Sequence, residues 1–361
     1  MPAAFRYASL AVSALALVAC GKQTAPTTPP EPVIAQAPEP EPEPEEVEPE
    51  APTRRVGDDA VAVGTFNLQW AHDALGDDGP KLSKQFRAQT EADWEWKVEQ
   101  IAKLLVAEKL DVVALQELGG NGEVTDIVMK VVELGGPNYD WAFVESTDRT
   151  AGHHVAILSV FPISNQRRLD IHMRRHLAAD IDLPNDHVVT FIAFHAAGGK
   201  YAGNEKTRTK QAKALKRKVN ALQKENPVIV LGTANSPYLP DAKEYKGSSV
   251  GMLAGAVTRQ DSDDCLDSAN FISGQATNVH GETTDRILTC GLEITDVEMS
   301  GHEAIIRNEL DPTDQVWSAV PTEAAPFRDV SDHLVLWAEI AVPKPPAPEA
   351  EGGGDTSTAS P

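Results

Sequence analysis

Five short segments of the chain place a polar residue suited to metal or phosphate chemistry at the end of an apolar, strand-like run. In sheet enzymes, the ends of strands are where a rigid scaffold presents acids, bases and ligands together. We therefore expect these polar residues to meet in one site. The segments are 64–67, ending in Asn67; 112–117, ending in Glu117; 190–195, ending in His195; 228–235, ending in Asn235; and 331–335, which contains Asp332 and His333.

Together these segments resemble the endonuclease/exonuclease/phosphatase family of metal-dependent phosphodiesterases, which includes deoxyribonuclease-like nucleases, abasic-site endonucleases and neutral sphingomyelinases. The resemblance covers residues 60–341, and its most specific motif is Ser-Asp-His-Leu-Val at 331–335. It implies an α/β fold, a four-layer sandwich of two mainly antiparallel sheets flanked by helices. The alternation of strand and helix patterns in the sequence by itself supports mixed α/β.

The resemblance also implies a divalent metal site with one or two ions, usually Mg²⁺ and alternatively Mn²⁺. Glu117 ends the run Asp-Val-Val-Ala-Leu-Gln-Glu and matches the glutamate that binds the metal, a hard cation that prefers oxygen ligands. Asn67 would support the metal or a phosphate oxygen, and Asp332 would help to hold the metal. Taken alone, an asparagine at a strand end is more often a turn former.

Four further residues match catalytic positions of the family. His195, followed by Ala-Ala-Gly-Gly-Lys, would donate to phosphate oxygens, and Asn235 would bind a phosphate oxygen. His333 would act on the phosphoryl group or the attacking water. Asp285, in Thr-Asp-Arg-Ile-Leu, would orient His333, because a carboxylate fixes the imidazole tautomer and raises its basicity. The alternative is that Asp285 is a hairpin-turn residue.

One position departs from the family pattern. Family members usually read Gly-Asp-x-Asn where this chain has Gly-Thr-Ala-Asn at 232–235. Thr233 cannot accept a proton or add charge to a metal site at pH 7. Loss of a general base typically costs about 10²–10⁴-fold in rate.

Two hypotheses follow from this departure. The first is a working or weakened metal-dependent phosphodiesterase, with nucleic acid, a nucleotide or a phospholipid headgroup as substrate. The second is a catalytically impaired member that binds a phosphorylated ligand or a protein partner. The joint presence of the other seven residues favours the enzyme, whereas Thr233 and the acidic composition favour the second hypothesis.

The periodicity predicts helices over 92–109, 124–134 and 208–225, and strands over 60–68, 111–115, 139–145, 155–160, 188–194, 228–231, 286–289 and 334–340. Segments 169–172 and 178–182 alternate as exposed antiparallel strands do. Among the histidines, the role of the pair at 153–154 stays open. His172, His176 and His187 lie on weakly patterned polar segments, and we expect them at the surface.

The two ends of the chain predict targeting and tether segments. Residues 1–20 have the shape of a secretion signal, and Leu-Val-Ala-Cys-Gly at 17–21 resembles a bacterial lipobox in which Cys20 becomes lipidated. The alternative is an ordinary signal peptide with an incidental cysteine. Residues 21–57 read as a disordered Pro/Glu tether and 343–361 as a disordered tail. We expect a monomeric domain over 58–342, lipid-anchored at the bacterial cell envelope and either periplasmic or on the cell surface.

The domain is acidic and poor in cysteine. The chain carries −22, and removing the signal (+1), the tether (−5) and the tail (−2) leaves −16 on residues 58–342. Such a charge disfavours tight, non-specific binding of nucleic acid, where affinity comes from neutralising phosphates. Besides Cys20 there are only Cys265 and Cys290, which are either one disulfide, as oxidising conditions outside the cytoplasm favour, or two free thiols. Neither has the spacing of a zinc site.

Overall fold

The computed structural model describes residues 56–57, 59–73, 90–145, 153–199, 202–236, 249, 251, 265–278, 281–290, 292–301 and 330–342. The chain divides into two units, 1–49 and 50–361. The first lies entirely outside the described residues, so the architecture below is that of the second. The expected signal peptide with Cys20, most of the tether and the C-terminal tail also lie outside them. No helix in the described ranges is long and apolar enough to span a membrane.

Two six-stranded sheets form the scaffold of the second unit. In the first sheet the strand order is β11 (Ile294–Ser300), β12 (Val335–Ala341), β1 (Ala60–Ala71), β2 (Val112–Leu118), β4 (His154–Ser159) and β3 (Asp140–Val144). In the second sheet it is β5 (Ile163–Ile171), β6 (Arg174–Leu183), β7 (His187–His195), β8 (Val228–Thr233), β10 (Asp285–Cys290) and β9 (Cys265–Asp267).

Each sheet contains one parallel pair among antiparallel neighbours. The pair is β1–β2 in the first sheet and β7–β8 in the second. All other paired strands run antiparallel. The prediction of two mainly antiparallel sheets is therefore confirmed.

Helices connect the strands of both parallel pairs, because parallel neighbours need a crossover that returns the chain to the same end of the sheet. Helix α1 (Glu91–Glu108) joins β1 to β2, and α3 (Ala202–Leu222) joins β7 to β8. A capping box formed by Thr90 and Asp93 begins α1. The other described helices are α2 (Asn121–Glu133), α6 (Ser268–Phe271) and a 3₁₀ turn, η2 (Pro184–Asp186).

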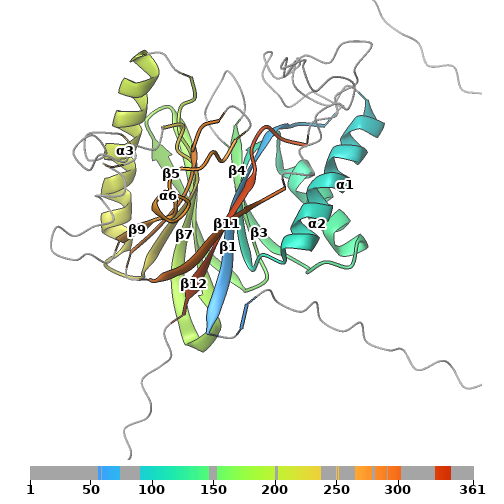
Figure 1. Cartoon of the computed structure of the whole chain (residues 1–361), viewed down its shortest axis with the longest axis horizontal. Coiled ribbons are helices and arrows are strands. Elements are labelled where there is room, and N and C mark those ends of the chain that lie inside the picture. Colours follow the sequence, from blue (N-terminus) through green and yellow to red (C-terminus); the bar gives the residue numbers. More distant parts are fainter. Residues whose placement is uncertain are drawn as a thin grey trace, which may run out of the picture. The chain divides into compact units, whose positions relative to one another are not determined.

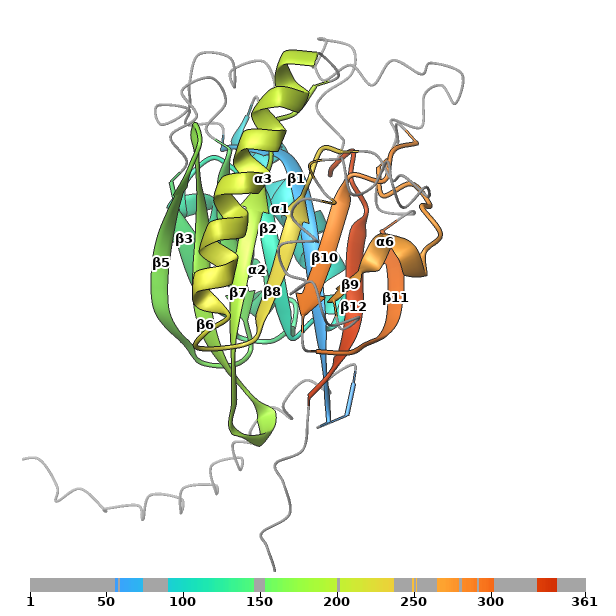
Figure 2. The same ribbon diagram turned by 90° about the vertical axis from the view of Figure 1, so that its left-hand side faces the viewer.

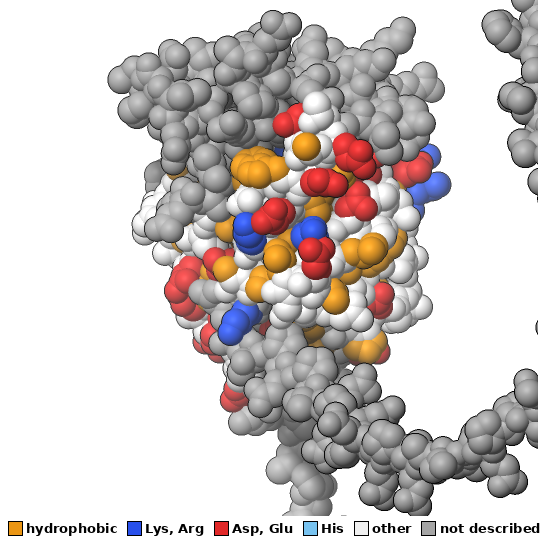
Figure 3. Space-filling view, turned by 90° about the vertical axis from the view of Figure 1, so that its right-hand side faces the viewer, with side chains coloured by type: hydrophobic (Ala, Val, Ile, Leu, Met, Phe, Trp, Pro, Cys, Tyr) orange, Lys and Arg blue, Asp and Glu red, His pale blue; other side chains and the backbone are white. Residues whose placement is uncertain are grey.

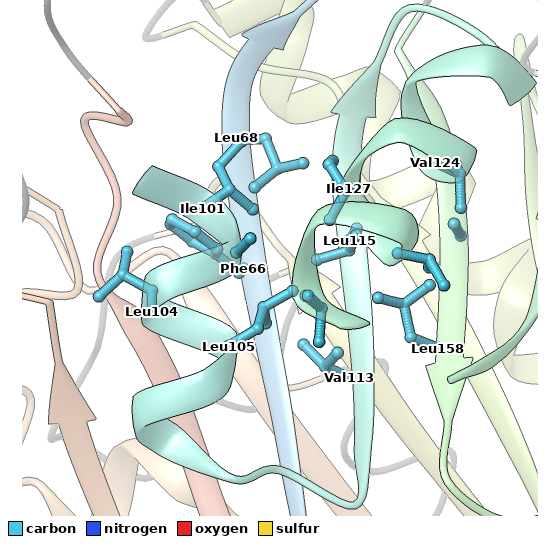
Figure 4. Packing of buried hydrophobic residues seen from close by; sticks show 14 of the residues in the cluster. Phe66, Leu68, Ile101, Leu104, Leu105, Val113, Leu115, Val124, Ile127 and Leu158 are labelled. Atoms are coloured by element: carbon cyan, nitrogen blue, oxygen red, sulfur yellow. The ribbon is translucent and has the colours of Figure 1, made fainter. Parts of the chain in front are cut away.

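The elements stack in four layers, as predicted. Helices α1 and α2 cover the outer face of the first sheet, and α3 covers the outer face of the second, lying over β7 and β8 (Figures 1 and 2). One buried apolar cluster lies between the two sheets, and another lies between the second sheet and α3. A third joins the first sheet to its helices, where Ile101 and Leu105 of α1 pack beside Phe66 and Leu115 (Figure 4).

Several boundaries differ from the sequence expectations. Helix α3 begins six residues earlier than expected, and α2 begins at Asn121 after an N-cap glycine that makes no side-chain bond. Strand β6 is buried along most of its length rather than exposed, because it lies between β5 and β7 and one of its faces packs in the core between the sheets. Strands β9 and β11 were not predicted, since one is three residues long and the other is largely polar.

Candidate active site

The carboxyl ends of the two parallel pairs meet at the same end of the sandwich. Asn67 is the last residue of β1 before its register with β2 shifts, and it donates from Nδ2 to Glu117 Oε1 (3.1 Å) and to Thr233 Oγ1 (3.1 Å). His195 Nε2 lies 3.4 Å from Glu117 Oε1. Side chains from β1, β2, β7 and β8 are thus in direct contact across the two sheets, as the strand-end pattern predicted.

A bulge turns Glu117 toward this junction. The register of β2 breaks between Gln116 and Leu118 against both of its neighbours, and Glu117 between them adopts a left-handed φ of 63°. Bulges re-aim a side chain, and left-handed non-glycine residues cluster at functional sites. Oε2 of Glu117 accepts a hydrogen bond from the backbone of Trp70 (3.2 Å), so both carboxylate oxygens have fixed partners.

Asn67 holds its neighbours in place. Its Oδ1 accepts from Gln69 N (3.0 Å) while Nδ2 faces Glu117 and Thr233. The amide oxygen is therefore used inside the protein, and the side chain orients Glu117 through its nitrogen. The expected contact of Asn67 with a metal or a phosphate oxygen stays a prediction.

Asp285 and His333 form a buried pair. His333 Nδ1 lies 2.7 Å from Asp285 Oδ2, and Thr277 and Thr284 also donate to that oxygen, at 2.8 and 3.3 Å. Burial alone would lower the pKa of His333, but the charges of Asp285 and Asp332 and the bond to Asp285 raise it to about 10. Asp285 therefore contacts His333 as the resemblance implied, instead of standing in a hairpin turn.

The segment that carries His333 is fixed from several sides. Ser331 donates from Oγ to Asn67 O (2.5 Å), and the same Oγ accepts from His333 N (3.0 Å). A backbone bridge also pairs His333 with Asn278. Asp332 Oδ1 lies 3.6 Å from His333 Nε2, with 17% of the aspartate side chain exposed. Asp332 is therefore part of the same charged cluster.

Thr233 lies at the centre of the polar network. Its Oγ1 donates to Asp285 Oδ1 (2.8 Å) and accepts from Asn67 Nδ2, and Gln116 Oε1 is 3.4 Å away. Because a hydroxyl has one proton, the shorter contact to Asp285 takes it. Where family members have a carboxylate, this chain has a neutral link between Asn67 and Asp285.

His195 approaches the same oxygen of Glu117 as Asn67 does, Oε1. Burial, followed by the charge of Arg174, holds the pKa of His195 well below its usual range, so the ring is neutral at pH 7. Asn235 Nδ2 lies 3.3 Å from His195 Nε2 and donates to the backbone oxygen of Ala196 (2.9 Å). The structure therefore brings His195 and Asn235 together, as expected.

Arg174, at the start of β6, was missed in the sequence. The guanidinium is buried and donates to the backbone oxygens of His195 (2.9 Å) and Ala196 (2.7 Å), and it also contacts His153 Nδ1 (3.0 Å). No local sequence signal identifies this residue, since its partners lie about twenty positions away in the chain. It fixes the backbone that presents His195.

Two of the other histidines also belong to this region. The expectation that His176 lies at the surface is wrong: the side chain is buried against β7, and its Nδ1 accepts from His195 N (3.3 Å). The ring of His153 packs edge-on against that of His195, with centroids 4.8 Å apart. His172 is exposed and His187 is partly buried.

Helix α3 contributes support to the same loop. Arg208 donates to the backbone oxygens of Ala197 (3.0 Å) and Gly199 (2.9 Å), and Gln211 Oε1 accepts from Ala197 N (2.9 Å). These side chains hold the Ala-Ala-Gly-Gly segment after His195.

The donor set fits a magnesium-type ion. Each of its two carboxylates lies beside one of the site histidines: Glu117 Oε1 is 3.4 Å from His195 Nε2, and Asp332 Oδ1 is 3.6 Å from His333 Nε2. Among the described residues, no group of three or more His, Cys, Asp or Glu side chains has metal-site spacing. Mg²⁺ commonly binds through one or two carboxylates, with water and substrate phosphates completing its shell. Two carboxylates are enough for this ion.

The two domain cysteines face each other in the backbone register. Cys265 on β9 and Cys290 on β10 are opposite partners of an antiparallel pair. Directly opposed residues have Cα atoms about 4.5–5.5 Å apart, which is within the range for disulfides. The register is compatible with the expected bond, which remains a prediction.

Comparisons with known proteins found similarity to solved structures. No family model and no curated protein sequence matches the chain. An endonuclease/exonuclease/phosphatase from Bacteroides vulgatus superposes with a TM-score of 0.52 at 15% identity, covering 79% of this chain and 99% of that one. A protein of the same description from Beutenbergia cavernae gives 0.51 at 16%, covering 78% and 72%.

The catalytic domain of human Nocturnin, solved with a bound sulfate anion, gives a TM-score of 0.50 at 16% identity, covering 78% of this chain and 93% of that one. At these identities the likeness concerns the fold. The described part of the chain has the fold of the endonuclease/exonuclease/phosphatase proteins, as the strand-end segments predicted.

Proposed function

We propose that this chain is a metal-dependent phosphodiesterase that hydrolyses phosphoester bonds. The observation that carries the proposal is the buried Asp285–His333 pair, which lies in the same polar network as Glu117 and His195. A protonated His333 donates to a phosphoryl oxygen and stabilises the negative charge that develops there during attack by water. His195, beside Glu117, and Asn235 contact the remaining phosphoryl oxygens.

Glu117 and Asp332 are the residues that would hold the ion, Mg²⁺ or Mn²⁺. When held there, such an ion would supply Lewis-acid polarisation of a phosphoryl oxygen and a lowered pKa for its bound water. Asn67 keeps Glu117 in position through its amide nitrogen, and the bulge at Glu117 keeps the carboxylate pointing into the junction. The fold likeness to a domain that binds sulfate, a tetrahedral anion like phosphate, supports an anion site in this fold.

The cellular setting is part of the proposal. The lipobox-like segment at 17–21 supports attachment to a membrane through Cys20, with the domain acting as a monomer at the bacterial cell envelope. The substrate would then be a nucleic acid, a nucleotide or a phospholipid headgroup that reaches the envelope. The charge of −16 on the domain favours substrates recognised at the site over those held by a broad basic surface.

Metal-dependent release of p-nitrophenol from bis-(p-nitrophenyl) phosphate by the full chain tests the proposal. Turnover is expected with Mg²⁺ or Mn²⁺ and not with EDTA. Glu117→Gln, which keeps the shape of the side chain and removes its charge, should lower turnover by about 10²–10³-fold. Glu133→Gln is the matched control, because Glu133 is an exposed glutamate on α2 paired with Lys130. Turnover that EDTA and Glu117→Gln leave unchanged would contradict the proposal.

Thr233 supports a second candidate function, a site that binds a phosphorylated ligand or a protein partner without hydrolysing it. Replacement by aspartate distinguishes the two. In a working enzyme, Thr233→Asp places a second carboxylate beside Asp285, 2.8 Å from the present hydroxyl, and turnover should fall or stay level. An inactive wild type that gains metal-dependent turnover on Thr233→Asp would show an intact scaffold disabled at Thr233; it would contradict hydrolysis by the wild type and favour the binding function.

A further inference from the structure

Two aromatic side chains border the candidate site and have no part in the chemistry proposed above. Trp70 and His153 pack together with ring centroids 4.6 Å apart, and His153 packs in turn against His195. Both are partly exposed, whereas His195 is buried. We name Trp70 and His153 the ring wall. It adjoins His195, which contacts phosphate in the proposed function, and both of its side chains are partly exposed.

The backbone is distorted to place Trp70 in this wall. Gln69 and Trp70 are consecutive left-handed residues, with φ of 43° and 57°, a conformation that L-residues avoid. Each backbone N–H and C=O of the two residues has a hydrogen-bond partner. The partners are Asn67 Oδ1 for Gln69 N (3.0 Å), Lys97 Nζ for Gln69 O (2.7 Å), Glu117 Oε2 for Trp70 N (3.2 Å) and His72 N for Trp70 O (2.8 Å).

Two of these partners, Asn67 and Glu117, belong to the candidate site itself. Such strain persists only where the surrounding structure enforces it, and it occurs preferentially at ligand-binding and active sites. The same contacts that set the geometry of the carboxylate therefore set the position of the Trp70 ring. This coupling indicates that the ring and the phosphate chemistry serve one ligand.

The chemistry of His153 selects the kind of ligand. A guanidinium can only donate, so the contact between Arg174 and His153 Nδ1 leaves this nitrogen unprotonated. The buried positive charge of Arg174 behind the ring disfavours a cation on the wall. A neutral planar ring has no such penalty and gains stacking energy on an aromatic side chain.

We propose that Trp70 and His153 form a stacking subsite for a nucleobase or a similar heteroaromatic ring attached to the phosphate held by the candidate site. The inference rests on the proposed function, because the ring must be linked to a phosphate, and it deepens that function by choosing nucleotides or nucleic acid over phospholipid headgroups. Stacking on aromatic side chains tolerates different bases, so the subsite would recognise the ring rather than one sequence.

Binding of product-like ligands to the full chain, measured by calorimetry in the presence of Mg²⁺, tests the subsite without requiring turnover. Thymidine 5′-monophosphate and 2-deoxyribose 5-phosphate differ only in the base. Wild type should bind the nucleotide about tenfold more tightly, in line with stacking on one aromatic platform. Trp70→Ala should abolish this difference and leave the affinity for the sugar phosphate within about twofold. Trp70→Phe, which restores a ring, should recover most of the difference in affinity between the nucleotide and the sugar phosphate.

Three outcomes would overturn the subsite. They are equal affinity for the two phosphates, no measurable binding of either, and a Trp70→Ala variant that weakens both to the same degree. Tighter, Trp70-dependent binding of phosphocholine would instead assign the wall to a quaternary ammonium headgroup. The two proposals fail separately: base discrimination without metal-dependent hydrolysis contradicts only the catalytic function, and hydrolysis without discrimination contradicts only the subsite.

Discussion

At the scale of single residues, the hydroxyl of Thr233 connects the two halves of the site. It donates to Asp285 from β10 and accepts from Asn67 on β1, so one uncharged group joins the second sheet to the first. A carboxylate in this place could accept from Asn67 but could not donate to Asp285 unless protonated. The network therefore depends on a hydroxyl donor at position 233. This explains how Asn67 and Asp285 stay linked although the aspartate of the family pattern is absent.

Replacing Thr233 with valine, which has nearly the same shape, tests this role. Asn67 and Asp285 would each lose a buried hydrogen bond, so the free energy of unfolding should fall by about 1–3 kcal/mol. Turnover should fall as well, because Asp285 orients His333. Thr233→Ser keeps the hydroxyl and should retain both properties. Urea unfolding and phosphodiester hydrolysis measure the two effects; a valine variant as stable as wild type would exclude the bridging role.

The sequence predicted some of these residues and not others, for a physical reason. Glu117 and His195 end apolar runs, and a strand end is visible in local sequence. Arg174 and His176 act through partners on the neighbouring strand β7, and their roles depend on strand pairing that no local pattern encodes. Trp70 is distinguished by its backbone conformation, which the sequence does not reveal either.

At the scale of elements, the approach of β7 and β8 depends on Gly232. Its φ is 146°, and a Cβ at this position would lie 1.9 Å from the backbone oxygen of Phe194 on the neighbouring strand. The glycine before Thr233 is thus required by the close approach of two strands. The predicted strand over 228–231 was correct, and the structure extends it to Thr233. Asn235, two residues later, has a left-handed φ of 50°.

Gly232→Ala should therefore be strongly destabilising, by more than about 2 kcal/mol, since the obstructing atom is backbone and cannot rotate away. Gly122→Ala is the matched control, because a Cβ there has no neighbour within 4 Å and the position lies in helix α2. Alanine at Gly122 should leave stability unchanged or raise it by about 0.5–1 kcal/mol. Chemical unfolding of both variants checks the contrast, and equal stabilities would contradict it.

At the scale of the whole domain, one described face carries mixed charges, and several histidines are neutral because of burial. The face over α1 and α2 carries acidic and basic side chains interspersed with apolar ones (Figure 3), including the pairs Lys103–Glu99 and Lys130–Glu133. Inside, burial lowers the pKa of His176 to about 3 and that of His154 to about 4, and it holds that of His195 well below its usual range.

These histidines predict loss of stability in acid. Each is neutral when folded and takes up a proton near pH 6.5 when unfolded, so its contribution is complete above pH 6.5 and declines as the pH falls toward the folded pKa. One such group contributes a slope of about 1.4 kcal/mol per pH unit. His176→Asn, whose Oδ1 can still accept from His195 N, should make the slope shallower by about that amount between pH 6 and 4. Urea unfolding at several pH values measures the slope, and the same dependence of the free energy of unfolding on pH in wild type and variant would refute the prediction.

The pairing of β1 with β12 has a consequence for synthesis of the protein. Ser331 contacts Asn67 across 264 positions of sequence, and β12 completes the side of β1 opposite β2. A chain emerging from the ribosome, N-terminus first, has to expose that edge until almost the whole domain has appeared. The nascent chain also lacks Asp332 and His333 throughout this time. If the proposed activity holds, it arrives only with the last strand, so truncated products would lack it.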